Sequence, residues 1–101
     1  MKPDKRIRVL VVDDSALMRK LIPQMIEDDP AIEVVGTAMD GSFALKKIEE
    51  LKPNVITLDL QMPGMNGIDT LKEIMRHEPL PVIVVSSHST EGASVTSVVC
   101  G

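Results

Sequence analysis

One carboxylate in this chain stands where a side chain is poorly placed for packing and well placed for chemistry. Asp59 ends the apolar stretch 55–58, and a Pro/Gly-rich loop follows it. Open α/β sheets bind their ligands at the carboxyl ends of their strands. The position therefore predicts that Asp59 carries the function and that the rest of the chain shapes its pocket.

Further polar side chains follow two other apolar stretches. Asp13 and Asp14 come directly after residues 7–12, and Ser86 closes the stretch that begins at Val82. If these strands are neighbours, the three acids converge on one pocket, where like charges raise each other's pKa. A hard divalent cation such as Mg²⁺ resolves this conflict, because it prefers oxygen ligands. A carboxylate oxygen could then attack an incoming phosphoryl group and form an acyl phosphate.

The elements that position these residues alternate along the chain. Almost continuous apolar, β-branched runs predict strands that are covered on both faces, as in a parallel sheet. Apolar residues at helical spacing lie between them. The expected strands are 7–12, 33–38, 54–58 and 82–87, and the expected helices lie at 17–26, from 41 to 51, from 67 to 75, and in the tail after Ser89 or Thr90.

Several end signals refine this prediction. Asp14 or Ser15, Asp40 and Asn66 are expected to cap the first three helices. Pro23 lies inside the first helix and predicts a local distortion. The βαβαβαβα order predicts one α/β domain, a doubly wound parallel sheet with helices on both faces.

Composition narrows the class of protein. The 101 residues carry a net charge of −4, which argues against binding to nucleic acid, and the aromatic content of 1% argues against a base-stacking platform. One cysteine excludes an internal disulfide and fits a reducing cytoplasm. No apolar run approaches the ~20 residues of a membrane span. We expect a cytoplasmic protein without membrane insertion.

Together these motifs resemble the receiver domain of two-component response regulators, and most closely the receiver of chemotaxis protein-glutamate methylesterases. The resemblance runs from about residue 6 to the end of the chain. It implies a flavodoxin-like sheet with strand order 2-1-3-4. It rests on the acidic pair Asp13-Asp14, on Asp59, on the loop Met62-Pro63-Gly64-Met65-Asn66-Gly67, on Ser86, and on the sequences 11–19 and 85–93.

The resemblance also implies roles for these residues. Asp59 would be the phosphoacceptor, and Asp14 and Asp59 direct Mg²⁺ ligands. Asp13 would act through a bound water, and the backbone carbonyl of Gln61 would complete the ligand set. Ser86 would be the switch hydroxyl. The phosphoryl donor would be the phosphohistidine of a chemotaxis-type histidine sensor kinase. Gly64 and Gly67 are expected to permit turn geometry.

The chain departs from the family pattern at its end. The family has a fifth strand ending in Lys-Pro and then a fifth helix, whereas this sequence stops at Cys100-Gly101. We therefore expect residues 1–101 to form a receiver that is incomplete at its C-terminus. Its fourth strand would be an open edge that favours homodimerisation or strand exchange. No esterase domain is present, so a phosphoacceptor is expected rather than an enzyme.

Two other functions stay open at this point. One is a receiver-like interaction fragment that oligomerises through the open edge and is not phosphorylated, which the missing lysine favours. The other is a phosphohydrolase with an aspartyl nucleophile. Such enzymes resemble Asp-x-Asp at the nucleophile, whereas the residue two positions after Asp59 is Gln61.

Overall fold

A computed structural model describes residues 6–60, 67–77, 79–86 and 95–99 of the chain. Strands and helices alternate as far as the fourth strand, and one more strand follows. The elements are β1 Ile7–Val12, α1 Ala16–Ile26, β2 Ile32–Ala38, α2 Gly41–Leu51, β3 Val55–Asp59, α3 Gly67–His77, β4 Val82–Ser86 and β5 Val95–Val99. The α/β class and the first seven elements agree with the sequence prediction.

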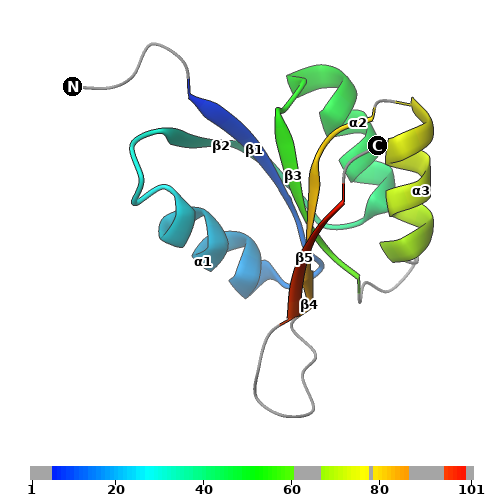
Figure 1. Ribbon diagram of the computed structural model, residues 1–101. Coiled ribbons are helices and arrows are strands. Elements are labelled where there is room, and N and C mark those ends of the chain that lie inside the picture. Colours follow the sequence, from blue (N-terminus) through cyan, green and yellow to red (C-terminus); the bar gives the residue numbers. More distant parts are fainter. Residues whose placement is uncertain (1–5, 61–66, 78, 87–94, 100–101) are drawn as a thin grey trace.

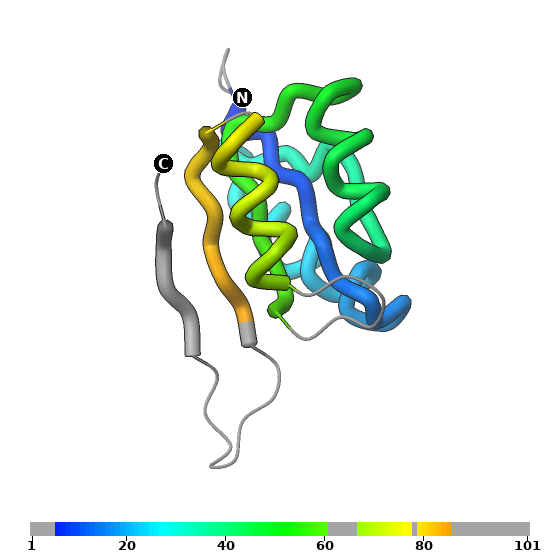
Figure 2. Tube along the Cα trace, turned by 90° about the vertical axis from the view of Figure 1, so that its right-hand side faces the viewer, coloured from blue at the N-terminus to red at the C-terminus, as the bar shows by residue number. Residues whose placement is uncertain are grey.

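The sheet has the order β2-β1-β3-β4-β5. The first four strands are parallel, so the predicted order 2-1-3-4 is confirmed. The helix α1 lies on one face of the sheet, and α2 and α3 lie on the other (Figure 1). Figure 2 looks onto the second face, where α3 runs in front of β3 and beside β4. This is the doubly wound arrangement that the alternation of elements predicts.

The structure after β3 differs from the sequence prediction at the outer edge of β4. We expected a helix in the tail and an open edge at the fourth strand, and both expectations are wrong. The strand β5 pairs with β4 in the antiparallel direction, with Val82 opposite Val99 and Ser86 opposite Val95. The two strands lie side by side in Figure 1. Strand exchange through the edge of β4 therefore loses its structural basis, since the backbone groups of that edge are already paired.

Two apolar clusters hold the layers together. The larger one joins the sheet to α2 and α3 and includes Leu10, Val12, Ile56, Leu58 and Ile74. The smaller one joins it to α1 through residues that alternate with these along β1, namely Val9 and Val11, and through Ile22. Each buried side chain of this size stabilises the fold by about 1.5–3 kcal/mol. The alternation confirms that the central strand is covered on both faces.

Some apolar residues of the three helices are exposed. In α1 only Ile22 is buried, and Leu17, Leu21 and Met25 are exposed. Phe43 in α2 and Ile68 in α3 are also exposed. The apolar stripes of these helices are therefore only partly buried.

The helix ends follow the predicted signals where the structure describes them. The side chain of Ser15 accepts a hydrogen bond from the backbone N–H of Met18, and that of Asp40 accepts one from Phe43. The helix α1 continues through Pro23, as expected. Asn66, expected to cap α3, lies outside the described residues.

The cap of α2 gives a test of this local structure. Asp40→Ala removes the acceptor of the Phe43 N–H and is expected to lower the free energy of unfolding by about 1 kcal/mol. Ser42→Ala is the matched control: Ser42 is exposed in the first turn of the same helix, and alanine favours helix there. Urea unfolding measures both. An Asp40→Ala variant as stable as Ser42→Ala would contradict the assignment of the cap.

Candidate metal and phosphoryl site

The site forms where β1 and β3 end side by side. These strands pair in parallel, and their last register pair joins Val12 to Leu58. The next residue on each strand is an aspartate, so the pairing brings Asp13 and Asp59 to the same edge of the sheet. Both are almost fully buried, with 2% and 3% of their surface exposed. This is the convergence that the sequence predicts.

Asp14 completes a group of three carboxylates. One ligand oxygen of each of Asp13, Asp14 and Asp59 lies within 4.8 Å of the others, and Asp14 is exposed whereas the other two are buried. No other group of three or more such ligands occurs among the described residues. The site is therefore open to solvent on the side of Asp14 and closed on the side of the sheet.

The turn that carries Asp13 and Asp14 is held at several points. The backbone N–H of Asp13 donates to the carbonyl of Ala38 (3.0 Å), which ties the turn to the end of β2. The Oδ1 atom of Asp13 accepts from the N–H of Ser15 at 2.9 Å. The guanidinium of Arg19 donates from Nη1 to the backbone carbonyl of Asp13 at 2.8 Å. These bonds fix the acidic turn before any ligand arrives.

Burial raises the pKa of the Asp13 carboxyl above its ordinary value of 3.8, and the charges of Asp59 and Asp14 raise it further. The hydrogen bond from Ser15 and the charge of Arg19 act in the opposite direction without cancelling these effects. The cluster thus holds negative charge that the protein compensates only in part. Such a cluster is suited to bind a cation.

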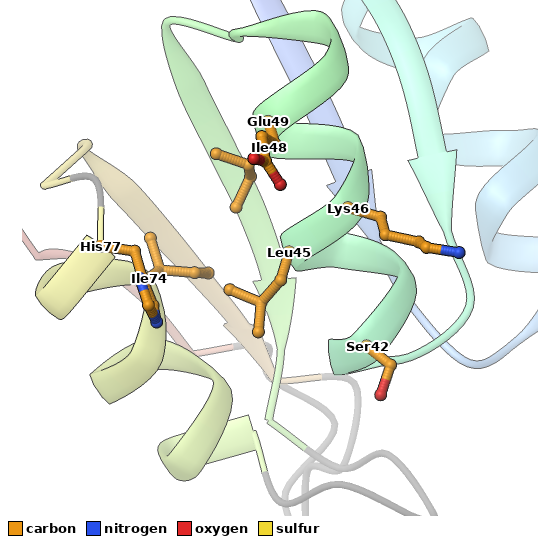
Figure 3. Close-up of a pocket in the computed structure, with 7 residues that line it drawn as sticks. All are labelled: Ser42, Leu45, Lys46, Ile48, Glu49, Ile74 and His77. Atoms are coloured by element: carbon orange, nitrogen blue, oxygen red, sulfur yellow. The ribbon is translucent and has the colours of Figure 1, made fainter.

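The remaining candidate residues are placed less completely. Ser86 is the last residue of β4, one position beyond Val85, which pairs with Asp59. It therefore lies at the same edge of the sheet, and its side chain is not described. Gln61 and Gly64 lie outside the described residues. No acidic residue of the cluster lines the cavity of about 440 Å³ between α2 and α3, into which Leu45 and Ile74 point (Figure 3).

Two residues that lie beside the acidic site were not recognised from the sequence. Arg19 lies four residues after Ser15, one helical turn along α1, and this spacing could have shown that its side chain returns to the acidic turn. Gly67 was assigned to turn geometry, but it is the first residue of α3 and does not have a positive φ. Its close approach to Leu60, the residue that follows β3, depends on how α3 packs and leaves no signal in the local sequence.

This fold and this acidic edge define the receiver class of signalling domains. A family model described as the response regulator receiver domain matches residues 9–101, and the chain belongs to this family. None of the helices in the described part of the chain is long and apolar enough to cross a membrane.

Among the curated proteins, the chain is similar to protein-glutamate methylesterases. The chain is 67% identical over 90 residues to "Protein-glutamate methylesterase/protein-glutamine glutaminase 2" of Koribacter versatilis, covering 89% of this chain and 25% of that protein. It is 60% identical over 90 residues to the corresponding protein of Halalkalibacterium halodurans, covering 89% and 26%. The chain thus spans about a quarter of the length of the curated relatives it matches, within which it corresponds to the receiver.

Solved structures agree with this assignment. The response regulator domain of Thermotoga maritima CheB is 54% identical with a TM-score of 0.79, covering 88% of this chain and 66% of that chain. The isolated REC domain of RcsB from Salmonella enterica serovar Typhimurium, determined in the presence of the phosphomimetic BeF₃⁻, is 29% identical with a TM-score of 0.78, covering 85% and 65%.

Because the three carboxylates repel one another, removing the charge of Asp13 should stabilise the fold. Asn at position 13 keeps the oxygen that accepts from Ser15 and removes a buried charge. In chelator at pH 7, Asp13→Asn is therefore expected to raise the free energy of unfolding. The gain should shrink towards pH 4, because a carboxyl with a raised folded pKa destabilises the fold only once it ionises.

Urea unfolding at the two pH values measures this effect. Asp28→Asn is the control, because Asp28 is exposed and its replacement changes the net charge by the same amount. A stability of Asp13→Asn below that of the parent chain at pH 7, with Asp28→Asn unchanged, would contradict the repulsive cluster.

Proposed function

We propose that this chain is the phosphoacceptor of a chemotaxis-type two-component system and that Asp59 takes the phosphoryl group. The observation that carries the proposal is the buried carboxylate of Asp59 at the end of β3, within 4.8 Å of two further carboxylates. Membership of the receiver family supports it. A lone carboxylate at a strand end would support many functions, but three acids at one sheet edge support few.

The donor set fits Mg²⁺. The described donors are all carboxylate oxygens, and the exposed side at Asp14 leaves room for the waters that Mg²⁺ retains. We propose Asp14 and Asp59 as direct ligands, with the backbone carbonyl of Gln61, and Asp13 as a ligand through water. When bound, Mg²⁺ supplies positive charge that offsets the acids and attracts the phosphoryl oxygens.

The chemical step then belongs to Asp59. One of its carboxylate oxygens attacks the phosphorus of a phosphohistidine, and an oxygen–phosphorus bond forms. The phosphorus–nitrogen bond breaks, and its electron pair remains on the imidazole of the donor. The product is an acyl phosphate on Asp59. Burial of Asp59 in the sheet edge limits the access of competing water.

The response of the domain is assigned to Ser86. The proposal is supported by the pairing of Val85 with Asp59, which puts the next residue of β4 at the same edge of the sheet as the proposed phosphoacceptor. We propose that the Ser86 hydroxyl donates a hydrogen bond to a phosphoryl oxygen and pulls the end of β4 towards the site. In a longer protein of the methylesterase type, this shift would relieve inhibition of the esterase domain. The donor would be a chemotaxis-type histidine kinase.

The phosphoacceptor role is tested with a small phosphodonor. Incubated with acetyl phosphate and Mg²⁺, the chain should gain the mass of one phosphoryl group, and Asp59→Asn should gain none because the nucleophile is lost. Asp28→Asn should react like the parent chain, since Asp28 is exposed and lies in the turn after α1. Chelation of Mg²⁺ should return the reaction to background. Intact-mass spectrometry over time measures all four samples.

Two results would exclude this function. A parent chain that stays unmodified and binds no beryllofluoride at millimolar Mg²⁺ would favour the non-phosphorylating interaction fragment. Turnover of a generic phosphate ester that Asp59→Asn abolishes would instead favour a phosphohydrolase.

The switch role has its own prediction. Ser86→Ala should still accept the phosphoryl group on Asp59, because the nucleophile is intact. Phosphorylation should change hydrogen exchange in β4 of the parent chain and leave it unchanged in Ser86→Ala. Exchange that responds equally in both chains would assign the switch to another group.

A further inference from the structure

The first residue of α3 lies unusually close to the residue that follows Asp59. A Cβ built on Gly67 would be 2.4 Å from the Cα of Leu60, 2.7 Å from its carbonyl oxygen and 2.8 Å from its carbonyl carbon. Carbon atoms in contact are ordinarily about 3.5–4.0 Å apart. Any side chain at position 67 therefore requires the backbones of α3 and Leu60 to separate by about 1 Å.

The partner in this contact has little freedom to yield. Leu60 packs against the apolar cluster between the sheet, α2 and α3. Its chain neighbour Asp59 is buried and paired with Val85 in β4. On the other side, Thr70 and Ile74 hold α3 with side chains that are fully buried. A displacement at Leu60 would therefore pass to Asp59 through a single peptide unit.

Conformation alone does not explain the glycine at this position. Gly67 does not have the positive φ that disfavours other residues, so alanine could adopt its backbone angles. Alanine is also the better helix former. The space beside Leu60 is the property that only glycine provides here.

We propose that Gly67 is a positioning residue for the phosphoacceptor. The absence of its Cβ lets the start of α3 press against the backbone of Leu60, and this contact fixes where the Asp59 carboxylate stands relative to Asp13 and Asp14. The inference rests on the proposed function, because it concerns the reaction at Asp59. It predicts that one added methyl group misplaces the nucleophile without touching the acids themselves.

The matched pair of variants is Gly67→Ala and Gly36→Ala. A Cβ on Gly36 would also be close to a neighbour, at 2.7 Å, but that atom is Cδ1 of Leu51, the far end of a flexible side chain. Both variants add the same methyl group, and only one meets backbone next to the site. A misplacement of about 1 Å can reduce a reaction rate by about 10²-fold. We expect this loss of phosphorylation by acetyl phosphate in Gly67→Ala, and a rate within about twofold of the parent chain in Gly36→Ala.

A lower rate in Gly67→Ala could come from a less stable fold or from a displaced Asp59 carboxylate, and the two causes must be separated. Ile48→Val is the reference for this, because it trims a buried side chain of α2 that is not among the site residues. Rates are compared per folded molecule, with the folded fraction taken from circular dichroism. Mg²⁺ titration provides a second readout. Affinity should fall in Gly67→Ala and stay unchanged in Ile48→Val, because only the former moves the proposed ligand Asp59.

A second variant keeps the test decisive if Gly67→Ala does not fold. Leu60→Ala leaves Gly67 in place and releases Leu60 from the apolar cluster, so the end of β3 is less firmly held. Its rate per folded molecule should fall well below that of Ile48→Val. A folded Gly67→Ala that reacts at the rate of Gly36→Ala would overturn the inference, and so would an unaffected Leu60→Ala.

Different results would contradict the phosphoacceptor function and the positioning role of Gly67. If the parent chain takes no phosphoryl group, the proposed function is wrong and Gly67 has no reaction to position. If the parent chain and Gly67→Ala are phosphorylated equally fast, the function stands and the role of Gly67 is wrong.

Discussion

The parallel pairing of β1 with β3 is the constraint on which the site depends. Its register joins Val12 to Leu58 and so forces the next residues, Asp13 and Asp59, to the same edge. Two charges 4 Å apart repel by about 1–4 kcal/mol in the dielectric range from water to a protein surface. Leu10, Val12, Ile56 and Leu58 are buried in the same pair of strands, and each contributes about 1.5–3 kcal/mol. Apolar packing therefore outweighs the repulsion between the carboxylates. The repulsion remains in the folded state, at a position where a bound cation can reduce it.

The two acid-bearing strand ends are held by the helices that follow them, in different ways. The turn after β1 is fixed by hydrogen bonds, from Ser15 to the Asp13 carboxylate and from Arg19 to the Asp13 carbonyl. The end of β3 is held by close packing, with Gly67 of α3 against the backbone of Leu60. Hydrogen bonds suit the turn after β1 because its partly buried polar groups need partners in place of water. Close packing suits the buried strand end, where a displaced backbone has no free space to occupy.

The side of β4 that faces away from β3 is covered by β5. The residues of β5 are mostly β-branched and favour a strand over a helix, and β4 offers them unpaired backbone groups. Local propensity alone was too weak to decide between a poor helix and a strand. The decision came from the partner strand, because an edge strand gains a ladder of hydrogen bonds only when a second strand is in place.

The sequence by itself determined the elements and the identity of the acids. Apolar runs of β-branched residues, helical spacing, and caps such as Ser15 and Asp40 are local signals. They were sufficient to predict the alternation of strands and helices and a parallel sheet, and they singled out the strand-end acids, whereas the strand order came from the resemblance to receiver domains. Tertiary structure decided what depends on the packing of elements against one another: the antiparallel β5, the exposure of Leu17 and Phe43, and the close approach of Gly67 to Leu60. Such features arise from contacts between elements, and the sequence around one residue carries no record of which backbone will lie against it.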